Sequence, residues 1–147
     1  MRREWRWLGL GTIVAIQKIL AASVIGVGLA GCVATTEVMD KLMASQEPPS
    51  PAIRKAIVNA ARDYLADPYS IRDVEISSVM TTPNPGLQAV CVKFNAKNAV
   101  GGYTGRTATA VQLQNGQPIG ANQGAPGCSE PRLKYYPFPE SDVLRKL

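Results

Sequence analysis

The chain of 147 residues contains no histidine, and this absence excludes several classes of function at once. Ser-His-Asp and Cys-His catalytic sets need histidine, which is also the commonest protein ligand for metals. The three cysteines include no Cys-x-x-Cys pair, which further disfavours a zinc site. An enzyme would have to use carboxylates, lysine or tyrosine, and no nucleophile stands beside a base in the sequence. We therefore predict that the protein is not an enzyme and holds no metal or cofactor.

Strong net charge is also missing once the N-terminal stretch is set aside. The formal net charge is +5, but residues 1–31 contribute +3 through four basic residues and one acidic residue, which leaves +2 for the rest. So small an excess gives no reason to expect a nucleic-acid partner. The 116 residues after position 31 are enough for one domain with its own core.

The longest apolar stretch lies near the N-terminus and ends at Leu29-Ala30-Gly31-Cys32. Arginines precede it and a polar sequence follows it, which is typical of a signal peptide over 1–31. Lys18 interrupts the stretch, and the apolar piece after it, 19–30, is too short to cross a bilayer. The alternative is an uncleaved anchor helix over 8–30, in which a central lysine costs about 2.5–3.5 kcal/mol on insertion scales.

The sequence Leu29-Ala30-Gly31-Cys32 resembles the lipobox of bacterial lipoproteins, where the signal peptide is removed and the cysteine is acylated. The resemblance implies that the thiol of Cys32 receives a diacylglyceryl group and that the membrane is a partner through this lipid. Val33 stands where an aspartate commonly signals retention in the inner membrane. The resemblance therefore favours the periplasmic face of the outer membrane, with the inner membrane as the alternative.

The same resemblance accounts for the odd number of cysteines. If Cys32 carries lipid, Cys91 and Cys128 remain to form a disulfide in an oxidising periplasm. Such a bridge would close a loop of about 37 residues and contribute about 3–4 kcal/mol in the chain-entropy account. The alternative is two unpaired structural thiols.

After the lipidated cysteine, the sequence predicts a tether over 32–50 and a small α+β domain over 51–147. The segment Gln46–Pro51 is rich in proline, which is typical of a tether, and Leu42 and its neighbours hint at a short amphipathic turn before it. The tether would hold the domain away from the membrane surface.

A helix is predicted from Ser50-Pro51 to about Ala66. Serine is a good N-cap and proline a good first helical residue, while Pro68 disfavours helical backbone at Asp67. Between these positions one apolar stripe recurs at helical spacing. It consists of Ile53, Ala56, Ile57, Ala60, Ala61, Tyr64 and Leu65.

The spacing of apolar residues then changes to two, which predicts strands over 72–80, 87–95 and 106–114. Asn115-Gly116 is the strongest hairpin signal in the chain, so a short edge strand over 117–121 is expected to return beside the third strand. The predicted fold is one helix packed on an antiparallel meander of three or four strands.

The alternation of the second strand sets its two faces. The helix should cover Val90, Val92 and Phe94, while Cys91 should point to the opposite face, where the tail with Cys128 could cross. The tail from residue 124 onward is rich in proline and glycine and is expected to be irregular, except for a short final helix over 141–147.

Two segments resemble a pattern in small, mostly uncharacterised bacterial envelope proteins. Asp67-Pro68-Tyr69-Ser70 matches a D-P-x-S turn, and the stretch from Cys91 to Gly105 matches a C-x-x-x-N-A-K-N-x-x-G-G-Y-T-G hairpin. The resemblance supports the fold and brings no agreed activity with it.

The loop of this hairpin has two interpretations. In the structural one, which we favour, its glycines supply positive φ and Asn98 caps a turn through its side chain. In the functional one the loop is a recognition edge, where Tyr103 stacks on a ligand and Lys97 and Arg106 hold a carboxylate or a sugar.

We therefore expect a lipid-anchored, non-catalytic lipoprotein that binds or supports an envelope protein or assembly. The alternative is a small ligand-binding or inhibitor module. It would use the Tyr103 loop to bind a peptidoglycan fragment or a glycan-cleaving enzyme.

Overall fold

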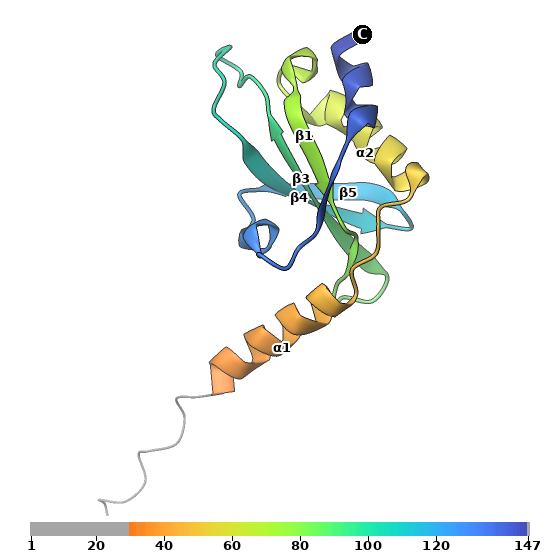
Figure 1. Cartoon of the computed structure of the whole chain (residues 1–147), viewed down its shortest axis with the longest axis vertical. Helices are drawn as coiled ribbons and strands as arrows, with labels where there is room; N and C mark the ends of the chain where they lie inside the picture. The colour runs from red at the N-terminus through yellow and green to blue at the C-terminus, as the bar shows by residue number, and fades with distance from the viewer. Residues whose placement is uncertain (1–29, 147) are drawn as a thin grey trace, which may run out of the picture.

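The computed structural model describes residues 30–146, with side chains from residue 36 onward, and shows an α+β domain built on one antiparallel sheet (Figure 1). The helices in this range are α1 (Ala30–Ala44), α2 (Pro51–Tyr64) and three short 3₁₀ helices, η1 (Pro68–Ser70), η2 (Pro126–Ser129) and η3 (Pro139–Lys146). The strands are β1 (Arg72–Ser77), β2 (Met80–Thr81), β3 (Leu87–Asn95), β4 (Thr107–Gln114), β5 (Gln117–Gln123) and β6 (Tyr135–Pro137). The predicted signal peptide lies outside the described residues, except for its last two positions.

The described strands follow the order β5-β4-β3-β1-β6, and β2 pairs with β3 beyond the end of β1. The α+β class is confirmed, but the sheet has six strands where three or four were expected. The first predicted strand is divided because the Ser77 hydroxyl accepts the backbone N–H of Cys91 at 2.8 Å and so takes the place of a carbonyl in the ladder. Pairing with β3 resumes three residues later at Met80.

Helix α2 forms where the sequence predicts it. The Ser50 hydroxyl accepts the backbone N–H of Ile53, and Pro51 occupies the first turn, where its missing N–H costs nothing. The helix ends at Tyr64, and Leu65 is already extended with its N–H bonded to the carbonyl of Ala61. The turn to Pro68 therefore follows within a few residues, as the preference of proline requires.

The two faces of the sheet carry separate apolar clusters, which we name the inner and the outer cluster. The inner cluster joins Val90, Val92 and Phe94 of β3 to α2 and η3. The outer cluster is built around the disulfide between Cys91 and Cys128, whose Cα atoms lie 5.6 Å apart. The predicted faces of β3 and the predicted disulfide are both confirmed.

The tail is more regular than the sequence predicts. It starts on the outer face, where Cys128 and Leu133 are buried, and then pairs with β1 as the edge strand β6. Beyond β6 it reaches the inner face, where Phe138 and Leu144 are buried beside α2 (Figure 1). The tail therefore covers both faces of the sheet by passing around one edge.

The predicted tether, 32–50, is structured over the residues whose side chains are described, 36–50. Helix α1 extends from the domain (Figure 1), and its C-terminal residues Leu42 and Met43 pack against the outer cluster. Glu47 exchanges two backbone hydrogen bonds with Val79, at 2.8 and 3.0 Å. The side chain of Gln46 accepts the N–H of Lys134 and donates to the carbonyl of Arg132. These two bonds take the place of the backbone hydrogen bonds that a neighbouring strand would form. The residues just before α2 are therefore bonded to the domain.

Candidate functional site

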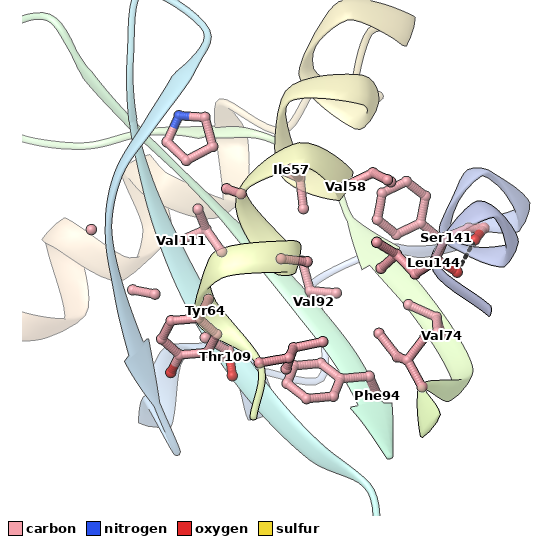
Figure 2. A pocket seen from close by; sticks show the side chains of 18 residues that line it. Ile57, Val58, Tyr64, Val74, Val92, Phe94, Thr109, Val111, Ser141 and Leu144 are labelled. Carbon is pink, nitrogen blue, oxygen red and sulfur yellow. Dashed lines mark hydrogen bonds between the residues drawn. The ribbon is translucent and has the colours of Figure 1, made fainter. Parts of the chain in front are cut away.

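A cavity of about 210 Å³ lies between α2 and the inner face of the sheet (Figure 2). Its walls come from α2, from the strands β1, β3, β4 and β5, and from η3. Most of its lining is aliphatic or aromatic. The lining residues are Ile57, Val58, Ala60, Ala61, Tyr64, Leu65, Ile71, Val74, Val92, Phe94, Thr109, Val111, Pro118, Gly120, Ala121, Phe138, Ser141 and Leu144.

Small residues form part of the lining on one side of the helix. Ala60 and Ala61 of α2 and Ala121 of β5 line the cavity, and longer side chains at these positions would take up part of its space. An interior is normally packed at the density of an organic crystal, so a void of this size is uncommon in a small domain.

The cavity opens toward solvent between α2 and β5. Tyr64, Gly120 and Ala121 are exposed although they belong to the lining, whereas Ile57 and Val92 on the opposite side are buried. Figure 2 shows Tyr64 and Thr109 at the same end of the lining, with Phe94 nearby in this view. A molecule could thus enter beside Tyr64 and reach the buried part of the inner cluster.

Thr109 is the unusual polar residue of this lining. It is 2% exposed, and its Oγ1 has no hydrogen-bond partner among the described residues. The other buried polar side chain of the lining, Ser141, donates its hydroxyl to the carbonyl of Phe138 at 2.7 Å. A buried hydroxyl without a partner keeps its desolvation cost of about 1–3 kcal/mol, and a ligand could remove that cost.

The loop singled out by the sequence lies away from this cavity. Asn98 Oδ1 accepts the backbone N–H groups of Val100 and Gly102 at 3.1 and 3.0 Å, and Gly101 has a φ of +82°. The loop is closed by a bridge between Lys97 and Tyr103. These contacts support the structural interpretation of Asn98 and the glycines.

The side chains proposed for recognition have partners inside the molecule. Tyr103 donates its hydroxyl to the carbonyl of Ser70, and the guanidinium carbon of Arg72 lies 3.8 Å from the centroid of its ring. Lys97 approaches the same ring at 5.7 Å, and Arg106 forms an ion pair with Glu75. Recognition of a ligand by this loop stays a prediction, which these contacts do not favour.

The D-P-x-S turn and the glycine-rich hairpin, the two segments that resemble a pattern in envelope proteins, contact each other in the structure. The Ser70 hydroxyl donates to the carbonyl of Asp67 at 2.8 Å and accepts the backbone N–H of Lys97 at 2.8 Å. The carboxylate of Asp67 accepts the N–H of Ser70. The D-P-x-S turn therefore fastens the base of the glycine-rich hairpin, which gives both segments a structural role.

The disulfide residues Cys91 and Cys128 are buried, and Tyr135 covers them from the tail. Its hydroxyl donates to the carbonyl of Cys128 at 2.7 Å, and the ammonium of Lys93 lies 3.6 Å from its ring centroid. Burial, followed by the charge of Glu75, raises the pKa of Tyr135 to about 12. This face is therefore held by a covalent bond and by polar contacts.

Arg132 connects the outer face to α1. Its guanidinium bonds the carboxylates of Asp40 and Glu130, each at 2.7 Å. The hydrogen bond from Arg132 lowers the pKa of Glu130. Cys32, the predicted lipid attachment, falls within the bounds of α1, and its side chain lies outside the description.

No metal centre or membrane helix was found in the described residues. Histidine, cysteine and carboxylate side chains there form no group of three that could hold a metal ion. In the same part of the chain, no helix has both the length and the apolar character needed to cross a bilayer.

The sequence contained part of the signal for the cavity. Its alternation placed Thr109 and Val111 on one face of β4, and its helical stripe included Ala60, Ala61 and Tyr64. What it could not supply was the register of β5, which brings Ala121 opposite Val111.

In comparisons with known proteins, no protein-family model, no curated protein and no solved structure matches this chain.

Proposed function

We propose that this chain is a lipid-anchored, non-catalytic lipoprotein of the bacterial envelope, whose domain binds a small apolar molecule between α2 and the sheet. The observation that carries the binding proposal is the cavity of about 210 Å³, which is lined mainly by apolar side chains and opens beside Tyr64. The proposed anchor rests on the resemblance of Leu29-Ala30-Gly31-Cys32 to a lipobox.

The volume of the cavity limits the size of the ligand. An engineered cavity of about 150 Å³ holds one benzene molecule, so by proportion a cavity of 210 Å³ holds about eight non-hydrogen atoms. Pockets for drug-sized molecules are larger, at roughly 300–1,000 Å³. The proposal therefore concerns a small molecule and places its site away from the Tyr103 loop.

The binding proposal can be tested with p-xylene, an apolar molecule of eight non-hydrogen atoms. Addition of p-xylene to the domain should raise its melting temperature and shift the methyl NMR signals of Val92 and Val111, which line the cavity. Ala61→Phe should abolish both effects, because the added ring would fill the space beside α2.

Ala52→Phe is the matched control for this experiment. Ala52 is exposed in the first turn of the same helix and does not line the cavity. This variant should respond to p-xylene as the original protein does. Binding that survives in Ala61→Phe, or that is absent from the original protein, would refute the proposed site.

The anchor has a separate test. In cells fed an alkyne-labelled fatty acid, the full chain should carry the label and float with membranes, and Cys32→Ser should lose both properties. Ala34→Ser changes a nearby small residue and should keep them. Label retained by Cys32→Ser would contradict the lipobox interpretation.

A further inference from the structure

The hydroxyl of Thr109 is placed among apolar side chains without a partner. Of the described residues, only Thr109 and Asn95 have a buried side-chain oxygen that lacks a hydrogen-bond partner, and Asn95 does not line the cavity. Folding thus removes the Thr109 hydroxyl from water without compensation, which is uncommon in native proteins. A polar atom in a bound ligand would supply the missing hydrogen bond.

The remaining lining sets further limits on the ligand. No charged side chain is among the residues that line the cavity in the described structure. A charged group buried there would lose its hydration without an opposite charge to replace it, and this is costly. The hydroxyl of Ser141 already donates its hydrogen bond to the backbone carbonyl of Phe138.

We infer that the ligand is a small neutral amphiphile of about eight non-hydrogen atoms in all, with an apolar body and one hydroxyl or carbonyl group that hydrogen-bonds to Thr109. This inference rests on the proposed function, since it concerns the same cavity. It adds the chemical class of the ligand and the residue that selects its polar group.

The test compares two probes of the same size and shape. p-Cresol differs from p-xylene by a hydroxyl in place of one methyl group. The ratio of their dissociation constants, Kd of p-xylene over Kd of p-cresol, is measured in the original protein and in Thr109→Val. Because the hydration cost of the cresol hydroxyl is the same in both proteins, it cancels in this comparison. Loss of one neutral hydrogen bond should lower the ratio about threefold to tenfold in the variant.

Thr107→Val is the matched control on the same strand. The hydroxyl of Thr107 already accepts a hydrogen bond from the Gln123 side chain, and Thr107 does not line the cavity. This variant should leave the ratio unchanged.

Thr109→Ser keeps the hydroxyl and should keep the ratio of dissociation constants within about twofold of the original protein. Thr109→Val should have a melting temperature no lower than that of the original protein, because it loses an unpaired buried hydroxyl.

The failures of the two proposals can be told apart. If the original protein binds neither probe, the proposed function fails and the inference fails with it. If both probes bind but Thr109→Val leaves the ratio unchanged, the inference alone is overturned. The same holds if Thr107→Val lowers the ratio as much as Thr109→Val.

Discussion

On the outer face of the sheet, three kinds of contact hold the covering segments in place: a disulfide, the hydrogen bond of the half-buried Tyr135 hydroxyl and the ion pairs of Arg132. On the inner face, α2 and η3 pack mainly through apolar side chains and leave a cavity beside Ala60 and Ala61. The two faces therefore differ in how they are covered. A disulfide fastens the segment on the outer face, whereas on the inner face α2 is joined to η3 by the ion pair of Arg54 with Glu140 and a cavity lies beside the helix.

The largest effect should come from breaking the outer face. Replacement of both Cys91 and Cys128 by alanine should lower the free energy of unfolding by about 4 kcal/mol, because the disulfide closes a loop of 37 residues in the unfolded chain. Urea denaturation measures this loss. A decrease under about 1 kcal/mol would show that the outer face does not depend on its covalent bond.

A pair of equal substitutions tests whether the two faces are packed differently. Ala110→Leu adds three carbons beside the outer cluster and should cost about 1–3 kcal/mol, as overpacking commonly does. Ala61→Leu adds the same atoms on the cavity side and should change the unfolding free energy by less than about 1 kcal/mol, because space is available. Equal costs in urea denaturation would mean that the cavity is not free space.

A smaller effect is expected at the base of the glycine-rich hairpin, beside the end of the inner cluster that contains Ile71. Ser70→Ala removes the hydroxyl that links Asp67 to Lys97 and should cost about 1–2 kcal/mol, with faster amide exchange in the hairpin that follows. Thr104→Ala, in the exposed part of the same loop, should change stability by less than about 0.5 kcal/mol. If the two variants behave alike in hydrogen exchange, the Ser70 link is not what holds the hairpin.

The smallest effect is a pH dependence of the outer face. The pKa of Tyr135 rises from its usual 10 to about 12 in the folded protein, so the neutral phenol is favoured by folding. This stabilisation is fully present below pH 10 and is lost as the pH rises toward 12. For a half-buried ring the loss should be on the order of 1 kcal/mol.

Tyr135→Phe supplies the reference for that measurement. Its unfolding free energy should be lower than that of the original protein near pH 8, because the bond to Cys128 is missing. The difference between the two proteins should shrink by pH 11.5. A constant difference from pH 8 to 11.5 would contradict the shifted pKa.

Much of the fold could be predicted because local signals and global packing agree. Asn115-Gly116 takes the positive φ angles of a tight hairpin, +52° and +74°, which these two residue types tolerate best. The alternation in β3 placed Val92 and Cys91 on opposite faces, and the resemblance to a lipobox left Cys91 and Cys128 to pair. Each of these predictions used neighbours in sequence or a chemical constraint.

The parts that the sequence did not predict depend on contacts between distant segments. The proline-rich segment before α2 is fixed because the side chain of Gln46 replaces a strand neighbour for residues near position 133. β6 forms because the edge of β1 is free to pair with Tyr136. The cavity brings small residues of α2 and β5 into one lining, and no local pattern in the sequence marks that meeting.

The most direct test of the cavity proposal is an intermolecular NOE measurement with p-xylene bound to the methyl-labelled domain. If p-xylene enters the cavity, NOEs should connect it to the methyl groups of Ile57, Val92 and Val111, which line the cavity, and these NOEs should be lost in Ala61→Phe. NOEs that are absent, or that reach only exposed methyl groups such as those of Val100, would contradict it.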